Sequence, residues 1–236
     1  MTKIFLATPA FDGKVHVQYA VSFAETFRLL AGYGIPILSR IVASGSLLVA
    51  ERNRLLQAFW ESDCTHILFI DSDLGWPAEC VKSLLDKNED FVAGCYPARV
   101  ENCFLFRPVF NEDMSIVKSD KQLLEMEYVP AGFMLIRRNV IAKMREQFPE
   151  LYFEPKHPDS AASRGFCFFN TEVWKGEFWG EDYYFCRKVR EAGFRIWVDP
   201  VIEFDHAGKR AMLLQALTNK KEDAMKPLEE KDENKS

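Results

Sequence analysis

The chain has 236 residues, 48% of them hydrophobic, and a formal net charge of −5 at pH 7. This size suits one α/β domain, or one domain with a small appended lobe. The acidic balance excludes an extended nucleic-acid surface, which needs clustered lysines and arginines. The first apolar run is too short for a signal peptide, no stretch approaches the roughly 20 apolar residues of a membrane span, and the six cysteines form no C-x-x-C pair. We therefore expect a cytoplasmic protein with reduced cysteines.

The first half of the chain alternates short apolar runs with amphipathic segments, which predicts an open parallel sheet covered by helices. Strands are predicted at 3–8, 35–42, 65–70 and 91–94, and helices at 15–30, at 46–60 and from Pro77. The run 65–70 is apolar throughout, which indicates a central parallel strand. The apolar residues that recur at helical spacing in the first helix are Val17, Ala20, Val21, Ala24, Phe27 and Leu30.

The second half of the chain is less regular. We predict strands at 128–137, 195–198 and 201–204, helices at 139–148 and 180–193, and a loop-rich region at 150–171. The chain shows no internal repeat. We predict a single domain over 1–218, followed by a charged, disordered tail at 219–236.

Asp71 and Asp73 directly follow the apolar run 65–70. Alone, D-x-D is a weak motif, because a chain of this size contains it about once by chance. In an extended chain residues i and i+2 point to one side, so both carboxylates would face one spot at the carboxyl end of a buried strand, where open α/β sheets bind ligands. Such carboxylates repel unless a cation accompanies them, and Mg²⁺ or Mn²⁺ fits. The alternative is that Asp73 caps the helix beginning near Pro77.

Glu181 and Asp182 begin the predicted helix at 180–193. Acidic residues in a first turn ordinarily stabilise the helix dipole, and taken alone the pair has that interpretation. Trp174 and Trp179 precede the pair, and aromatic rings beside carboxylates either stack on sugars or pack in a core. Asp182, or else Glu181, is ionised at neutral pH and is available as a general base.

His206 lies at the end of a short predicted strand, in the segment Glu203-Phe204-Asp205-His206-Ala207-Gly208. A neutral imidazole there would complete a metal site with Asp73. The residues alone favour this role and a structural role equally. The segment 154–176, which contains prolines and glycines, is in the same way consistent with a lid and with an ordinary surface loop.

Taken in order, these features resemble the GT-A fold glycosyltransferases, near the inverting family 2 and its small viral and bacterial members, including the chlorella-virus capsid type. The resemblance covers residues 3–208 and is carried by the segments 7–9, 51–54, 69–73, 129–134, 180–182, 190–194 and 205–208. No Gln-x-x-Arg-Trp motif of the processive synthases is present. A single-addition transferase is therefore expected.

The resemblance implies a GT-A (Rossmann-like) α/β fold, with a mostly parallel sheet flanked by helices and a smaller irregular lobe on the acceptor side. It implies a nucleotide-binding half at 1–100 and an acceptor and catalytic half at 101–218. The expected activity is transfer of a sugar from a nucleotide-diphosphate sugar, a UDP-sugar above all, to a hydroxyl of a glycan or another acceptor, with Mn²⁺ or Mg²⁺.

The resemblance also assigns roles to individual residues. The implied donor-binding residues are Thr8, Pro9, Ala10, Arg52, Asn53, Asp71 and Ser72. The implied metal ligands are Asp73, Asp71 and His206. The implied catalytic base is Asp182, with Glu181 beside it. Trp174, Trp179 and Arg99 are expected to contact the acceptor.

Two other functions remain open at this point. A sugar-nucleotide nucleotidyltransferase also uses aspartates and Mg²⁺ but needs a glycine-rich basic loop, whereas segment 8–14 has one glycine and one lysine. A catalytically inactive glycan-binding module would be expected to have lost one acidic pair, and both pairs are present.

Overall fold

The computed structural model describes residues 1–10, 12–43, 47–98, 104–154, 164–207 and 209–218. The predicted tail at 219–236, the acceptor candidate Arg99 and residues 155–163 of the segment 154–176 considered as a lid lie outside the described residues. Within them, none of the helices is both long and apolar enough to cross a bilayer.

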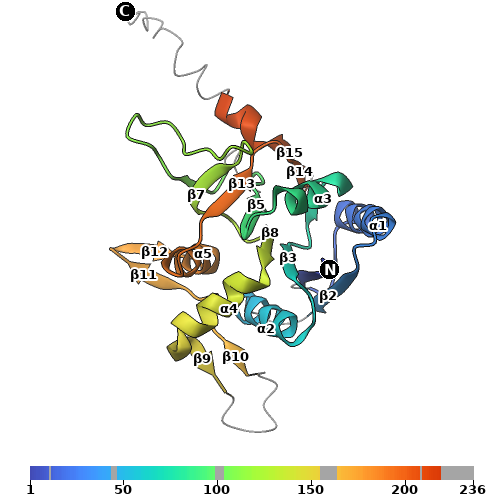
Figure 1. Ribbon diagram of the computed structural model, residues 1–236. Coiled ribbons are helices and arrows are strands. Elements are labelled where there is room, and N and C mark those ends of the chain that lie inside the picture. Colours follow the sequence, from blue (N-terminus) through green and yellow to red (C-terminus); the bar gives the residue numbers. More distant parts are fainter. Residues whose placement is uncertain (11, 44–46, 99–103, 155–163, 208, 219–236) are drawn as a thin grey trace, which may run out of the picture.

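An eight-stranded sheet forms the centre of the molecule, in the order β2-β1-β3-β8-β5-β13-β7-β6 (Figure 1). Its strands are β1 (Ile4–Ala10), β2 (Ile37–Ala43), β3 (His66–Ile70), β5 (Phe91–Gly94), β6 (Arg107–Pro108), β7 (Leu124–Tyr128), β8 (Phe133–Arg137) and β13 (Ile196–Asp199). β1 runs parallel to both β2 and β3, and β13 runs parallel to β5. β8 lies between β3 and β5 and is antiparallel to both, so β3 and β5 run in the same direction.

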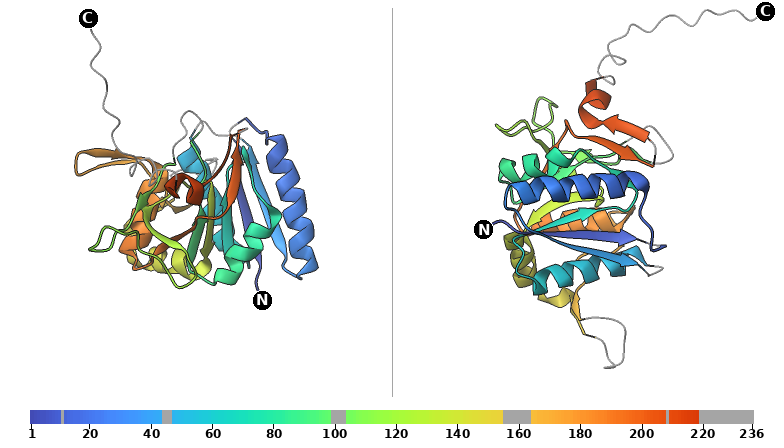
Figure 2. Two further views of the ribbon diagram at one scale, coloured as in Figure 1. Left: turned by 90° about the horizontal axis from the view of Figure 1, so that it is seen from above. Right: turned by 90° about the vertical axis from the view of Figure 1, so that its right-hand side faces the viewer.

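Five helices cover the two faces of this sheet (Figure 2). α1 (Val17–Gly32) and α3 (Ala78–Lys87) lie on one face, and α2 (Leu48–Glu61), α4 (Arg138–Gln147) and α5 (Glu181–Glu191) lie on the other. In β3, Ile67 and Phe69 point into the core under α2, while Leu68 and Ile70 point into the core under α1. This two-sided burial explains why the run is apolar throughout. The prediction of an α/β fold with a mostly parallel sheet flanked by helices is confirmed.

Shorter elements form the irregular part of the molecule. They are β4 (Leu74–Gly75), β14 (Glu203–His206) and β15 (Lys209–Met212) in a three-stranded sheet, the pair β9 (Tyr152–Phe153) and β10 (Gly165–Phe166), the hairpin β11 (Glu172–Trp174) and β12 (Glu177–Trp179), and the 3₁₀ turn η1 (Pro149–Leu151). The pairing of β14 with β4 sets His206 opposite Leu74, and therefore next to Asp73. These local pairings position part of the candidate site.

Two details of the predicted elements are wrong. The segment 128–137 is not one strand, because β7 ends at Tyr128 and the turn Val129–Gly132 leads into β8. The loop-rich region at 150–171 contains the short paired strands β9 and β10.

The buried face of α1 also differs from its apolar pattern. Its buried residues are Tyr19, Ser22, Thr26 and Leu30, whereas Val17 and Val21 are 79% and 52% exposed. The polar side chains on the inner face are accommodated by hydrogen bonds. Trp76 donates from its backbone N–H to Ser22 Oγ and from its indole to Thr26 Oγ1, each at 2.9 Å.

Arg138, the first residue of α4, joins the two halves of the chain. Its guanidinium donates to four backbone carbonyls at the end of α2 and just after it, those of Phe59, Trp60, Ser62 and Cys64, at 2.7–3.0 Å. These carbonyls include groups that a helix C-terminus leaves unsatisfied. The Arg138 guanidinium, from the second half of the chain, therefore caps the C-terminus of α2 in the first half.

Candidate functional site

Polar side chains converge at the edge of the sheet where the parallel strands β3 and β5 end. Asp71 follows β3, Tyr96 follows β5 after one residue, and Gly132 directly precedes the antiparallel β8. α2 and α5 run back across the sheet, so their amino-terminal residues, among them Arg52 and Glu181, come to the same edge. Open α/β sheets place ligands at this edge.

Arg52 is the buried centre of the site, with 2% of its surface exposed. Its Nη2 donates to Asp71 Oδ1 at 2.8 Å, and its Nε lies 3.6 Å from Glu181 Oε1. Burial alone would lower the pKa of Arg52, but Asp71, Tyr96 and Glu181 together raise it. One carboxylate from each of the two acidic pairs that the sequence singled out, Asp71 after β3 and Glu181 opening α5, therefore lies at the same guanidinium.

Tyr96 and Gly132 hold Asp71 from its other side. The Tyr96 hydroxyl donates to Asp71 Oδ2 at 3.2 Å and accepts the Gly132 N–H at 3.0 Å, while the Gly132 carbonyl accepts the Asp71 N–H at 3.0 Å. A Cβ at position 132 would lie 2.2 Å from Tyr96 Oη and 2.5 Å from Asp71 Oδ2. Only glycine fits this close approach of the backbone.

Asp73 makes a separate contact with His206. Residues 72 and 73 form a turn rather than an extension of β3, so the Asp71 and Asp73 side chains have different partners. Asp73 Oδ2 lies 3.0 Å from His206 Nε2, and both side chains are buried. The expectation that the two carboxylates share a face of an extended strand is therefore wrong. The alternative that Asp73 is the N-cap of α3 is also wrong, because the N-cap residue is Pro77, four residues after Asp73.

The surroundings of His206 fix its ring orientation. Its Nδ1 lies 2.6 Å from the Pro97 carbonyl, which can only accept, so Nδ1 carries a proton and Nε2 is directed at Asp73. The Tyr96 ring packs edge-on against the imidazole, with 5.0 Å between the ring centroids. Tyr96 therefore contacts both Asp71 and His206 and connects the two aspartate environments.

The donor atoms of Asp73 and His206 can be compared with the ligand atoms that divalent ions prefer. One carboxylate oxygen and one imidazole nitrogen, the latter oriented through its second nitrogen, fit Mn²⁺ better than Mg²⁺, which prefers oxygen ligands. Asp71 is directed instead at Arg52 and Tyr96. No three His, Cys, Asp or Glu side chains come together as a metal cluster in the described part of the chain. Asp73 and His206 are thus the pair that suits an ion.

Asp182 has the most informative protonation behaviour in the site. Burial and the neighbouring Glu181 raise the pKa of Asp182 to about 6, against the opposing effect of Arg52. Its Oδ1 accepts the Tyr183 N–H at 2.9 Å, and the helix terminus would favour the charged form. A carboxyl group whose pKa lies close to neutral pH is well matched to general-base catalysis.

An aromatic cluster lies beside Asp182. Tyr128 and Tyr183 stack with ring centroids 3.9 Å apart, and the edge contact between Trp179 and Tyr128 measures 5.7 Å. Trp174, on the same hairpin face as Trp179, is covered by the guanidinium of Arg187 at 4.2 Å. Of the two tryptophans expected to contact an acceptor, Trp179 lies in the cluster next to Asp182 and Trp174 lies one helical turn further along α5.

The segment expected to hold a nucleotide base lies at the end of β1. Thr8, Pro9 and Ala10 are all buried, and the Thr8 hydroxyl lies 2.6 Å from that of Tyr19. The Ser72 carbonyl accepts the His16 N–H at 2.9 Å. In this arrangement the Thr8 hydroxyl and the Ser72 carbonyl have protein partners.

Asn53 is directed away from Asp71. Its amide donates to the Phe169 carbonyl at 2.8 Å and accepts the Phe169 N–H at 2.9 Å. This two-point contact fixes the segment before β11 against α2. A nucleotide contact by Asn53 would require displacement of that segment.

Three tyrosines of the site, Tyr96, Tyr128 and Tyr183, were not singled out from the sequence. For Tyr96 a signal was present, because Gly94-Cys95-Tyr96 ends a predicted strand beside the one that carries Asp71. Burial and Asp71 raise the pKa of Tyr96 well above its usual value, so it remains a neutral donor. Tyr128 and Tyr183 meet only through the packing of β7 against α5, which no local pattern reveals.

Comparisons with known proteins found no matching family model and no matching curated protein. Similar solved structures include TarS 1–349 from S. aureus in complex with UDP-GlcNAc, with a TM-score of 0.46 and 14% identity over 84% of this chain and 56% of the TarS chain. A putative glucose-1-phosphate thymidylyltransferase from Bacillus anthracis has a TM-score of 0.43 and 12% identity, over 93% of this chain and 94% of the other.

A third similar structure is a glycosyltransferase involved in glycosylation of the major capsid of PBCV-1. Its TM-score is 0.32 and its identity 12%, over 69% of this chain and 71% of the other. This chain spans just over half the length of the TarS chain that it matches. These matches are low in identity, and the function of this chain is therefore argued below from its own residues.

Proposed function

We propose that this chain is a glycosyltransferase that moves a sugar from a nucleotide-diphosphate sugar, a UDP-sugar in the first instance, to an acceptor hydroxyl. The observation that carries the proposal is that Arg52 holds one carboxylate of each acidic pair, since its guanidinium is 2.8 Å from Asp71 and 3.6 Å from Glu181. This arrangement sets the residue after Glu181, the candidate base Asp182, beside the edge of the sheet where a donor would bind.

In the proposed reaction Asp182 acts as the general base. The acceptor oxygen forms a bond to the anomeric carbon of the sugar, and its proton passes to an Asp182 carboxylate oxygen. The bond between the anomeric carbon and the diphosphate oxygen breaks, and the nucleoside diphosphate leaves with the electron pair. Attack from the face opposite the leaving group inverts the configuration. A pKa of about 6 leaves Asp182 mostly ionised at neutral pH and able to take the proton.

The remaining residues of the site would position these groups. Arg52 and Tyr96 hold Asp71 in one orientation, ready for a donor hydroxyl or phosphate. Trp179, with Tyr128 and Tyr183, would offer an aromatic surface to the acceptor sugar. Asp73 and His206 would hold Mn²⁺, which when bound would neutralise charge on the diphosphate leaving group.

The first test measures nucleotide release. The full chain would be incubated with a panel of UDP-sugars, Mn²⁺ and simple glycan acceptors, and UDP would be quantified. We expect release for one donor, and a loss of roughly 10²–10⁴-fold in Asp182→Asn with the donor-induced thermal shift retained. Glu191→Gln, at the other end of α5, is the matched control. Near-normal turnover by Asp182→Asn would show that Asp182 is not the base.

A second measurement separates this activity from nucleotide transfer. The chain would be given a sugar 1-phosphate and a nucleoside triphosphate, and pyrophosphate would be measured. We expect none. Pyrophosphate production without UDP release would replace the proposal with a nucleotidyltransferase.

The ion site has a test that does not depend on turnover. Binding of Mn²⁺ would be followed by the loss of the free-ion electron paramagnetic resonance signal. We expect binding that weakens at least about tenfold in Asp73→Asn and in His206→Ala. Unchanged Mn²⁺ binding in both variants would exclude this pair as the ligands.

A further inference from the structure

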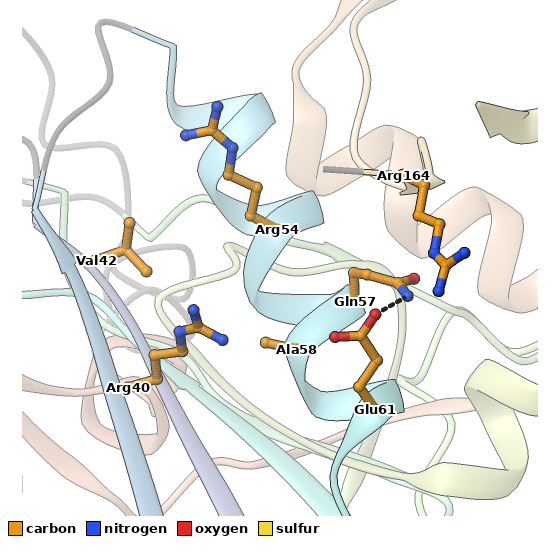
Figure 3. A pocket seen from close by; sticks show the side chains of 7 residues that line it. All are labelled: Arg40, Val42, Arg54, Gln57, Ala58, Glu61 and Arg164. Atoms are coloured by element: carbon orange, nitrogen blue, oxygen red, sulfur yellow. Dashed lines mark hydrogen bonds between the residues drawn. The ribbon is translucent and has the colours of Figure 1, made fainter. Parts of the chain in front are cut away.

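A cavity with several charged side chains in its lining lies on the opposite side of α2 from the candidate site. Its volume is about 490 Å³, within the range of small-molecule sites. It is lined by Arg40, Val42, Arg54, Gln57, Ala58, Glu61 and Arg164 (Figure 3). None of these residues belongs to the site around Arg52.

Elementary geometry separates the two sites. Arg52 and Arg54 are two residues apart on a helix, so their side chains leave the axis about 200° apart. Gln57, Ala58 and Glu61 follow Arg54 at helical spacings of three, four and seven residues and share its side of α2. Arg40 and Val42, two residues apart in β2, face that same side. The cavity is therefore built by β2 and α2, with Arg164 added from the residue before β10.

The cavity has a strong positive charge in an acidic protein. Three arginines and one glutamate line it, a formal charge of +2, whereas the whole chain carries −5. The Glu61 carboxylate accepts a hydrogen bond from Gln57 at 2.8 Å, and Arg54 pairs with Glu51 at 2.8 Å. In the described part of the chain neither Arg40 nor Arg164 has an ion pair or a hydrogen bond to its guanidinium. These two planar donors therefore remain available to an oxygen-rich anion.

We infer that this cavity binds a small, soluble compound carrying a diphosphate or two phosphate groups. The arginines lie on both sides of the exposed face of α2 (Figure 3), which suits an extended anion better than one carboxylate. Arg40 and Arg164 can each pair with one negative charge, and Val42 and Ala58 give the organic part of the ligand an apolar wall. Like-signed charge focused in a concave site raises the local concentration of such an anion.

The test uses inorganic pyrophosphate and the full chain, titrated calorimetrically at low ionic strength in the presence of a chelator. We expect binding that weakens about tenfold in Arg40→Gln and in Arg164→Gln, is lost in the double variant, and strengthens in Glu61→Gln. Both arginines are exposed, so their replacement leaves the fold intact. Arg28→Gln, an exposed arginine of α1, changes the net charge equally and should bind like the parent.

Three results would overturn the inference. One is pyrophosphate binding that is unaffected by the Arg40→Gln and Arg164→Gln changes. Another is binding that strengthens in Asp73→Asn and is unchanged in Glu61→Gln, which would place the anion beside the carboxylates of the candidate active site. The third is sedimentation with phosphatidylglycerol vesicles through the same arginines without pyrophosphate binding, which would assign the surface to lipid headgroups. No donor or metal enters this test, so absence of transferase activity would not change its outcome.

Discussion

At the scale of single residues, the protonation of Asp182 links catalysis to stability. Its pKa is about 6 in the folded chain and 3.8 in an unfolded one. Between these two pH values the folded state therefore binds more protons than the unfolded state. The free energy by which the protonated form stabilises the fold is fully present below pH 4 and is lost as the pH rises through 6. Asp182→Asn should raise the free energy of unfolding by roughly 1–3 kcal/mol at pH 7 and leave it unchanged near pH 4. Urea unfolding at the two pH values measures this difference, and destabilisation at pH 7 would contradict it.

The same ionisation predicts the pH dependence of transfer. If Asp182 is the base, kcat/KM should increase tenfold per pH unit well below 6 and level off above it. Glu191→Gln should show the same profile as the parent chain. A profile that is flat between pH 5 and pH 8, as set by the assay buffers, would remove Asp182 from the chemistry.

A substitution at Tyr96 would measure how much its hydroxyl contributes to the positioning of Asp71 and Gly132. Tyr96→Phe removes the donor to Asp71 Oδ2 and the acceptor of the Gly132 N–H, and it leaves the ring contact with His206 in place. Leaving the buried Gly132 N–H without a partner should cost about 1–3 kcal/mol of unfolding free energy, and activity should fall because Asp71 loses its second anchor. Thermal unfolding and UDP release would be measured together. Normal values of both would show that the hydroxyl has no positioning role.

At the scale of secondary-structure elements, α1 shows where periodicity misleads. The side chains of Ser22 and Thr26 are buried because Trp76 hydrogen-bonds to both, so the helix turns some of its apolar residues outward. Leu30→Ala, at a fully buried position, should cost about 2–5 kcal/mol, whereas Val21→Ala should change stability by less than about 1 kcal/mol. Equal costs in urea unfolding would contradict the observed face of the helix.

Local pattern otherwise located most elements of the sheet and its helices. The apolar runs that became β1, β3 and β5 and the segments that became α2, α4 and α5 are visible in the sequence because burial enforces their periodicity. The antiparallel insertion of β8 is not, since its partners β3 and β5 lie far away in the chain. The turn Val129–Gly132 was missed for the same reason. Gly132 is required by Tyr96 and Asp71, which no neighbouring residue reveals.

At the scale of the whole molecule, the two halves of the chain share one sheet. β8 and β13 come from the second half and pair with β3 and β5 of the first. Arg138 adds four hydrogen bonds between α4 and the end of α2. Arg138→Ala should therefore lower the unfolding free energy by about 3 kcal/mol or more, and a single lysine ammonium should restore only part of it.

Unfolding of the parent chain and of Arg138→Ala would be followed by tryptophan fluorescence and by far-ultraviolet circular dichroism. The two probes should give coincident transitions for both proteins, because β8 of the second half lies between β3 and β5 of the first half and joins the two halves in one sheet. Arg28→Ala serves as the exposed control. Separate transitions for the two probes would show that the halves unfold independently.

The candidate site was predictable in its parts but not in its assembly. The acidic pairs at 71–73 and 181–182 and the histidine at 206 are visible as unusual residues at the ends of predicted elements. Their grouping depends on Arg52, which is buried between Asp71 and Glu181. This burial follows because α2 and α5 pack against the same face of the sheet. Long-range packing of this kind leaves no trace in local sequence.

The position of β8 between β3 and β5 has a consequence for synthesis on the ribosome. β3 emerges early with one edge open, and its partner on that side is translated only after β5, β6 and β7. An apolar strand with an open edge is prone to pair with other chains. A nascent chain that pauses before β8 is translated would therefore be prone to aggregate and would be expected to bind chaperones. His206, the partner of Asp73, is translated later still. The contact between Asp73 and His206 can thus form only after β14 has been translated.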